Sequence, residues 1–132
     1  MKEIGIVAVG GVLGALLRYA LGLAIPHAGG FPLPTLLINW SGCLFLGLFF
    51  TLALDAERIS PAWRLGIGTG FTGAFTTFST FSVETLELLR QGNTGEALLY
   101  AGLSLAVGIA LSALGVRLGS AWGNRRPGGT AA

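Results

Sequence analysis

The sequence predicts an all-α membrane protein with four transmembrane helices. Of its 132 residues, 52% are hydrophobic and only 11% are charged, whereas ordinary soluble domains carry about a quarter charged residues. The mean hydropathy is +0.73. Such a chain has too few charged residues to form the surface of a water-soluble globular protein, so we expect it to fold in a lipid bilayer.

Crossing the hydrocarbon core takes roughly 20 consecutive apolar residues in a helix. Three segments meet this requirement without any charged residue, namely Pro34–Leu54, Leu65–Val83 and Ala97–Val116, and a fourth, Ile4–Ile25, is interrupted only by Arg18. The predicted helices span about residues 4–25, 34–54, 63–89 and 97–118. Together they form one domain, residues 1–122, and the Gly-, Arg- and Pro-rich segment 123–132 is expected to be a disordered tail.

In the first predicted helix, Gly10, Gly14 and Arg18 share one face, because they are spaced four residues apart. Small residues at this spacing let two helices approach closely in a membrane. The segment opens like a signal peptide after Lys2, but its apolar run is too long and Leu21–Pro26 offers no small-residue cleavage site. We therefore expect a retained helix.

The second predicted helix starts near Pro32 and Pro34, since proline suits a helix start and cannot continue a preceding helix. Asn39 lies on one face with Thr35 and Gly42, and is the polar hydrogen-bonding group of an otherwise apolar helix. Its amide could simply bond to a neighbouring helix, which is typically worth about 0.6 kcal/mol in membranes. Arg18, likewise, could simply extend to the lipid headgroups.

The third predicted helix is unlike the others. Four glycines between positions 66 and 73 precede the run TTFSTFS at 76–82, in which five of seven residues carry hydroxyls. Glycine loosens a helix, and Ser and Thr hydroxyls compete for its backbone groups. Non-helical backbone at membrane depth is tolerated only inside protein or beside water. We therefore predict a break near Gly73–Ser79, shielded by other helices.

The fourth predicted helix carries a polar stripe, because Tyr100, Ser104 and Ser112 share one face. Gly108 occupies the position in the stripe where a hydroxyl residue would be expected. The serine hydroxyls could instead bond to carbonyls of their own helix.

The few charged residues bear on orientation and on function. Four helices place both termini and the middle connection on one side, which holds six of the eight Lys and Arg residues and is therefore expected to be cytoplasmic. The net charge of +2 suits anionic lipid headgroups, and nothing indicates nucleic-acid binding. Cys43 and His27 are each the single residue of their type, so one chain can form neither a disulfide nor a zinc or haem site from them.

The polar groups within the predicted spans are neutral donors. No acid or base lies in the middle of any span, whereas a proton-coupled transporter normally needs one there. Asn39 and the hydroxyls can donate to an anion, and phenylalanine ring edges are electropositive. A broken helix also frees amide groups, which attract anions, and carbonyls, which attract cations.

Three motifs resemble the signature of the Fluc (CrcB) fluoride channels. They read Gly10-Gly11-x-x-Gly14-Ala15-x-x-Arg18-Tyr19, Pro34-Thr35-Leu36-x-x-Asn39-x-x-Gly42 and Gly70-Phe71-x-Gly73-x-x-Thr76-Thr77-Phe78-Ser79-Thr80-Phe81-Ser82-x-Glu84. The resemblance covers essentially the whole chain. It implies an antiparallel, dual-topology homodimer in the inner membrane of a prokaryote. Fluoride would leave the cell passively through two pores, which would make the cell resistant to fluoride toxicity.

The resemblance also implies roles for individual residues. Phe78 and Phe81 would present ring edges to fluoride, Asn39 would line the pore, and Arg18 would lie at a pore mouth. Further hydroxyl groups of the pore would come from Ser79, Thr80, Thr35, Tyr100, Ser104 and Ser112. A structural sodium ion would sit on the dimer axis, bound by the backbone carbonyls of Gly73 and Thr76 from both subunits.

Other interpretations remain open at this point. The six-to-two distribution of basic residues is stronger than a dual-topology homodimer would ideally show, so a paired, dissimilar subunit is an alternative. A small multidrug transporter would need a glutamate within the first helix, where only Glu3 occurs, at its very start. An intramembrane enzyme would need a Ser–His pair, a carboxylate pair or metal ligands at membrane depth. His27 is predicted in a loop and the carboxylates at helix ends, so we expect that the chain is not an enzyme. A structural subunit would pass no ions.

Overall fold

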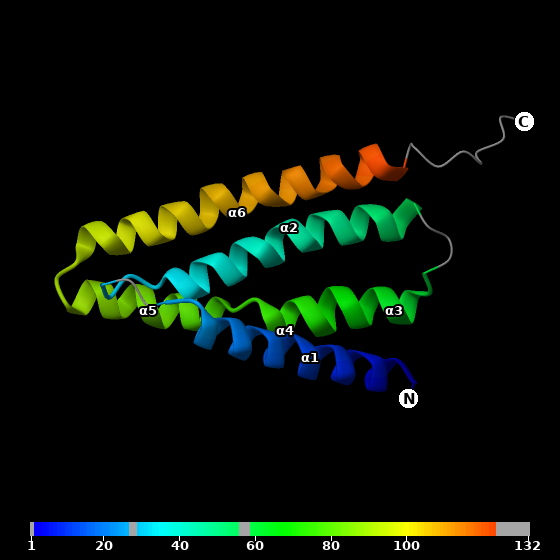
Figure 1. Ribbon diagram of the computed structural model, residues 1–132, viewed down its shortest axis with the longest axis horizontal. Coiled ribbons are helices and arrows are strands. Elements are labelled where there is room, and N and C mark those ends of the chain that lie inside the picture. The colour runs from blue at the N-terminus through cyan, green and yellow to red at the C-terminus, as the bar shows by residue number, and fades with distance from the viewer. Residues whose placement is uncertain (1, 27–28, 56–58, 124–132) are drawn as a thin grey trace, which may run out of the picture.

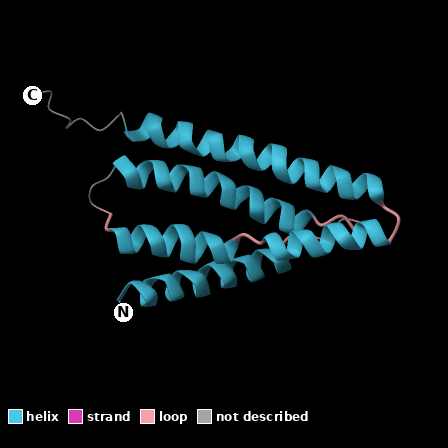
Figure 2. Cartoon of the chain, turned by 180° about the vertical axis from the view of Figure 1, so that it is seen from behind, coloured by secondary structure: helices cyan, strands magenta, loops and turns pink. Residues whose placement is uncertain are grey.

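The computed structural model describes residues 2–26, 29–55 and 59–123, and this part of the chain is helical (Figures 1 and 2). Three helices are long and apolar enough to cross a membrane: α1 (Lys2–Ala24), α2 (Leu33–Asp55) and α6 (Thr94–Gly123). Between α2 and α6 lie α3 (Pro61–Leu65), η1 (Gly66–Thr72), α4 (Gly73–Phe75) and α5 (Phe78–Arg90). The prediction of an all-α, multi-pass membrane protein is confirmed. The predicted tail, Gly123 apart, lies outside the described residues.

The helices form an elongated bundle. α2 and α6 lie side by side for most of their length, while α1 lies against η1 and α4 (Figure 1). The start of α1 and the end of α6 are at the same end of the molecule, and the turn between α5 and α6 is at the other end (Figure 1). This turn is set by Gly92, whose φ of +80° suits glycine after a helix end.

At the end that holds the two termini, helices touch through their backbones. A Cβ added at Gly10 or Gly14 of α1 would fall on the carbonyl oxygen of Gly66 or Phe71. In the same way, a Cβ at Gly47 of α2 would fall on the carbonyl oxygen of Ser112 of α6. The small residues of the first predicted helix therefore allow a close helix approach, as the sequence suggested.

Between α3 and α5 the chain departs from regular α-helix twice. η1 is a π-helical segment, in which the Thr72 hydroxyl donates to the carbonyl of Ile67, five residues back, at 3.0 Å. After α4, Thr76 (φ −80°, ψ 158°) and Thr77 (φ −145°, ψ 117°) are extended, and α5 begins at Phe78. The chain between α4 and α5 is thus non-helical at these two threonines.

Among the described residues, one buried apolar cluster lies between α2, α5 and α6. It consists of Leu36, Leu88, Ala97 and Tyr100, with Phe31, Trp40, Phe81 and Leu103 packed against it. Many other large apolar side chains are exposed on the bundle, among them Leu16, Leu23 and Leu105. Such an outer surface suits lipid.

Candidate functional site

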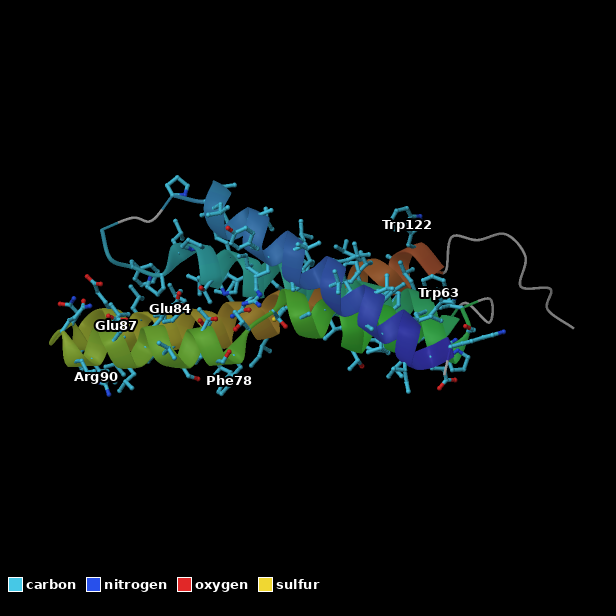
Figure 3. All side chains as sticks on the ribbon, turned by 90° about the horizontal axis from the view of Figure 1, so that it is seen from below. Trp63, Phe78, Glu84, Glu87, Arg90 and Trp122 are labelled. Atoms are coloured by element: carbon cyan, nitrogen blue, oxygen red, sulfur yellow. The ribbon has the colours of Figure 1, made fainter. Side chains whose placement is uncertain are left out.

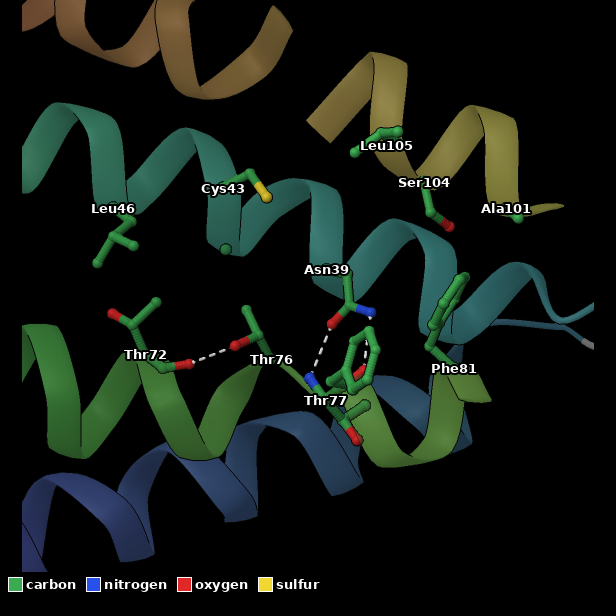
Figure 4. A pocket seen from close by; sticks show the side chains of 12 residues that line it. Asn39, Cys43, Leu46, Thr72, Thr76, Thr77, Phe81, Ala101, Ser104 and Leu105 are labelled. Carbon is green, nitrogen blue, oxygen red and sulfur yellow. Dashed lines mark hydrogen bonds between the residues drawn. The ribbon is translucent and has the colours of Figure 1, made fainter. Parts of the chain in front are cut away.

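The extended segment is held by the side chain of Asn39 from α2. The Thr77 amide donates to Asn39 Oδ1 at 2.8 Å, and Asn39 Nδ2 donates to the Thr77 carbonyl oxygen at 3.1 Å (Figure 4). The Asn39 amide therefore pairs with the Thr77 backbone as a neighbouring strand would. The amide group of asparagine has two N–H donors, so one of them is left for another acceptor.

The side chain of Thr77 caps the next helix. Its Oγ1 accepts from the Thr80 amide at 3.1 Å and donates to Thr80 Oγ1 at 2.9 Å. This is the usual way in which a threonine before a helix satisfies an amide of the first turn. The TTFST run thus starts α5, with Phe78 as its first residue.

A pocket of about 370 Å³ lies beside this segment, between α2, α5 and α6 (Figure 4). It brings together four of the predicted pore residues: Asn39, Phe78, Phe81 and Ser104. Its other lining residues include Cys43, Thr76 and Thr77. The pocket is therefore mostly apolar, with a few neutral hydrogen-bonding groups, and no lining residue carries a formal charge.

Ser104 supplies an unused hydroxyl to this pocket. Its Oγ is buried and has no hydrogen-bond partner among the described residues. A buried hydroxyl without a partner is costly, since it has lost its water without a replacement. An anion in the pocket could accept from Ser104 and from the remaining N–H of Asn39.

Phe78 and Phe81 lie at the pocket edge. Their ring centroids are 5.7 Å apart, and that of Phe81 is 5.1 Å from that of Tyr100. Phe81 is half-buried, whereas Phe78 is 80% exposed and points away from the ribbon of its own chain (Figure 3). Phe78 is thus held in the pocket wall but is not covered by the rest of the chain.

Glu84 has a role that the sequence analysis missed. Its carboxylate accepts from Thr35 Oγ1 at 2.8 Å and from Tyr100 Oη at 2.7 Å. It therefore ties α5 to both α2 and α6. Glu84 follows Phe81 by three residues and shares its helix face, which is the sequence signal that could have placed it on the inner side.

The other predicted pore residues are spread around this centre. Thr35 and Tyr100 are buried but bond to Glu84, and neither lines the pocket. Ser79 is exposed, while Thr80 is half-buried and bonded to Thr77.

Two predicted residues lie on helices beside this centre. Ser112 is half-buried on α6 and does not line the pocket. Arg18 is half-buried on α1, and its Nε is buried without a partner among the described residues.

The Gly108 position also differs from the predicted hydroxyl stripe. Gly108 is buried, and a Cβ there would lie 3.4 Å from the sulfur of Cys43. The thiol of Cys43 on α2 therefore faces Gly108 on α6, the position at which a hydroxyl residue would be expected. The polar stripe of α6 is interrupted at this point by two groups with little hydrogen-bonding capacity.

The described residues contain no cluster of three or more His, Cys, Asp or Glu side chains that could hold a metal ion. Backbone carbonyl groups can also bind a cation if they are not already hydrogen-bonded. In a regular α-helix the Gly73 carbonyl would accept from the Thr77 amide, and the Thr76 carbonyl from the Thr80 amide. Asn39 and the Thr77 hydroxyl take these two amides. Gly73 is exposed with open space around it, so the two carbonyls fit a hard cation that is bound by oxygen.

Comparison with known proteins gives a consistent result. Residues 5–116 match the family model described as CrcB-like protein, Camphor Resistance (CrcB). The chain is 53% identical over 122 residues to the fluoride-specific ion channel FluC of Acidobacterium capsulatum, covering 90% of this chain and 94% of that protein. It is 46% identical over 123 residues to FluC of Thermus thermophilus, covering 92% and 98%. FluC 2 of Geobacillus kaustophilus is 47% identical over 109 residues, covering 80% and 84%.

Proposed function

The chain belongs to the CrcB family, and we propose that it is a fluoride-selective channel that lets fluoride leave the cell passively. The similarity to channels named for fluoride supports this proposal over a multidrug-type transporter or a non-conducting structural subunit. The observation that carries it is the pocket beside Thr77, where the donors are neutral and the hydroxyl of Ser104 has no partner among the described residues.

The pocket residues suit a small anion. Fluoride sheds part of its hydration shell to the free N–H of Asn39, the hydroxyl of Ser104 and the ring edges of Phe78 and Phe81. Ring edges attract an anion without a fixed positive charge, and a fixed cation would hold fluoride too tightly for fast conduction. We expect chloride, the larger ion, to be rejected by the width of the pore and by donors spaced for a smaller ion. Arg18 attracts fluoride at a pore mouth, and the hydroxyls of Ser79, Thr80 and Ser112 lie along its path.

Thr35, Tyr100 and Glu84 form a hydrogen-bonded group behind the pocket, which they do not line. Because Glu84 accepts from both hydroxyls, it holds their oxygens in place, and the two hydrogen bonds stabilise its carboxylate. Fluoride passes beside Tyr100 and is kept on the donor side by the charge of Glu84.

The remaining parts of the proposal concern assembly. α3, η1, α4 and α5 together make the fourth, interrupted span, because none of them alone is long enough to cross a membrane. Two copies pair in antiparallel orientation, with dual topology, so that the partner covers Phe78, which its own chain leaves 80% exposed. Relatives carry the numbered names FluC 1 and FluC 2, so a paired, dissimilar subunit is the alternative partner.

A sodium ion on the dimer axis is part of the same proposal. The carbonyls of Gly73 and Thr76 would hold it, joined by the same groups of the second copy. When bound, the ion supplies positive charge that draws the carbonyls of two subunits together. The family membership and the bacterial relatives support the inner membrane of a prokaryote as the location.

The test is fluoride efflux from liposomes that contain the purified chain, measured with a fluoride electrode. We expect fast fluoride release and negligible chloride release from the same preparation, with protein-free liposomes as the control. Equal release of both ions would contradict selectivity. No fluoride release from well-reconstituted protein would contradict conduction by this chain alone, and adding a dissimilar subunit would then test the paired form.

A further inference from the structure

We infer that Asn39 is a positioning residue for the cation site: its side chain keeps the segment at Thr76 and Thr77 extended and so keeps the Gly73 carbonyl free to bind the ion. The inference rests on the proposed function, and it deepens that proposal by naming the residue that links the pocket to the sodium site on the dimer axis.

Two acceptors compete for the Thr77 amide: the Gly73 carbonyl and Asn39 Oδ1. The Thr77 amide has one hydrogen to give, and in a continuous helix it would go to the Gly73 carbonyl. Here it goes to Asn39 Oδ1 at 2.8 Å, and Asn39 Nδ2 returns a bond to the Thr77 carbonyl at 3.1 Å. The helix can therefore close over this point only if the bond to Asn39 breaks. The side chain of α2 competes directly with the cation-binding carbonyl for the same donor.

α2 is close enough to make these bonds because of Gly42. A Cβ at Gly42 would fall on the Cγ2 atom of Thr76, so no side chain separates α2 from the extended segment one turn after Asn39. Asn39 and Gly42 also line the pocket, together with Thr76 and Thr77 (Figure 4). The same side of α2 thus forms the pocket wall and holds the neighbouring backbone.

Thr77 makes the second half of this arrangement. Its hydroxyl accepts from the Thr80 amide at 3.1 Å, which would otherwise go to the Thr76 carbonyl. In the described part of the chain, no hydrogen bond to the Gly73 or Thr76 carbonyl is left. Two side-chain groups, the amide of Asn39 and the hydroxyl of Thr77, therefore release the two carbonyls of the proposed sodium site.

The test measures sodium binding through stability, so that it does not depend on conduction. The melting temperature of the purified protein is recorded in sodium chloride and in N-methylglucamine chloride of equal ionic strength. The set comprises the wild type, Asn39→Ala, Asn39→Asp and Ser41→Ala. Ser41 is the matched control, because it lies on the same helix and its hydroxyl donates to Ile38 of that helix at 2.8 Å.

We expect sodium to raise the melting temperature of the wild type and of Ser41→Ala. Asn39→Ala loses this increase, because the Thr77 amide returns to the Gly73 carbonyl. Asn39→Asp keeps most of it, because aspartate still accepts from the Thr77 amide. A full sodium effect in Asn39→Ala overturns the inference, and so does an Asn39→Asp variant that loses the effect as completely as alanine.

A second pair of variants keeps the test decisive if Asn39→Ala does not fold. Thr77→Val removes the hydroxyl that holds the Thr80 amide, whereas Thr77→Ser keeps it. We expect the valine variant to lose sodium stabilisation and the serine variant to retain it, and equal sodium effects in the two overturn the inference. A wild type without any sodium effect also overturns it, whereas failure of the channel proposal would appear separately, as absent fluoride efflux.

Discussion

The two ends of the helix bundle are held together in different ways. At the end that contains the termini, which we call the glycine end, backbones touch at Gly10, Gly14 and Gly47. At the other end, the polar end, side chains of one helix bond to groups of another. These bonds join Thr35 and Tyr100 to Glu84, Asn39 to Thr77, and Trp40 to the carbonyl of Leu103.

This difference distinguishes the glycine end, which stabilises the fold, from the polar end, which contains the candidate fluoride site. Lipid is as apolar as the side chains, so helices in a membrane associate through close packing and hydrogen bonds rather than through the hydrophobic effect. The glycine end uses the first means. The polar end uses the second, and its pocket holds the donors proposed for fluoride. Substitutions that break the close packing at the glycine end should therefore affect folding, and those that line the pocket of the polar end should affect conduction.

The largest effect is expected from Gly14→Val. A side chain there would meet the carbonyl oxygen of Phe71, which is backbone and cannot turn aside. We expect a loss of at least about 3 kcal/mol of stability, the upper range for overpacking, and little folded protein in gel filtration. Gly11→Ala is the control, because a Cβ there would lie 3.9 Å from the carbonyl oxygen of Gly70. Equal melting temperatures of the two variants would mean that close packing is not what holds this end.

Glu84→Ala should have the next largest effect. It leaves the hydroxyls of Thr35 and Tyr100 without an acceptor, and an orphaned buried donor costs about 1–3 kcal/mol. Glu84→Gln retains one acceptor oxygen, so we expect a smaller fall in the melting temperature. Glu87→Gln, at an exposed site on the same helix, should change nothing. A glutamine variant as unstable as the alanine variant would show that the acceptor oxygen is not what matters.

Ser104→Ala separates conduction from stability. Because its hydroxyl has no partner among the described residues, we expect a change in stability within about 0.5 kcal/mol, as at neutral surface positions. Fluoride efflux should nevertheless slow, since the pocket loses a donor. Ser120→Ala, at an exposed site of α6, serves as the control for both measurements. Unchanged efflux in Ser104→Ala would remove this hydroxyl from the pathway.

The smallest effect on fluoride efflux is expected from Gly108→Ser. A Cβ there would lie 3.4 Å from Cys43 Sγ, at the edge of ordinary contact, so the stability loss should stay below about 1.5 kcal/mol. The serine restores the hydroxyl that the stripe of α6 lacks, and efflux should be equal or faster. Gly102→Ser, in open space, is the control. If Gly108→Ser unfolds as Gly14→Val does, glycine packing extends into the polar end.

Much of the fold could be predicted because membrane crossing needs long apolar segments, which composition reveals directly. The faces shared by Gly10 and Gly14, and by Asn39 and Gly42, followed from helix periodicity. The groups with which these residues interact did not follow from helix periodicity. The bonds from Thr35 and Tyr100 to Glu84 depend on how three helices are rotated and shifted against one another, which no single helix determines. For the same reason, Asn39 could be marked as polar but its pairing with the Thr77 backbone could not be foreseen.

The most direct test of the account compares the same substitution at both ends. Phe81→Ile and Phe78→Ile change rings at the pocket, whereas Phe49→Ile changes a half-buried ring of α2 outside it. All three should fold, and fluoride efflux from liposomes should fall about tenfold or more in the two pocket variants, equivalent to about 1.4 kcal/mol, but stay near the wild-type rate in Phe49→Ile. Wild-type efflux in both pocket variants would contradict the claim that fluoride passes along these ring edges.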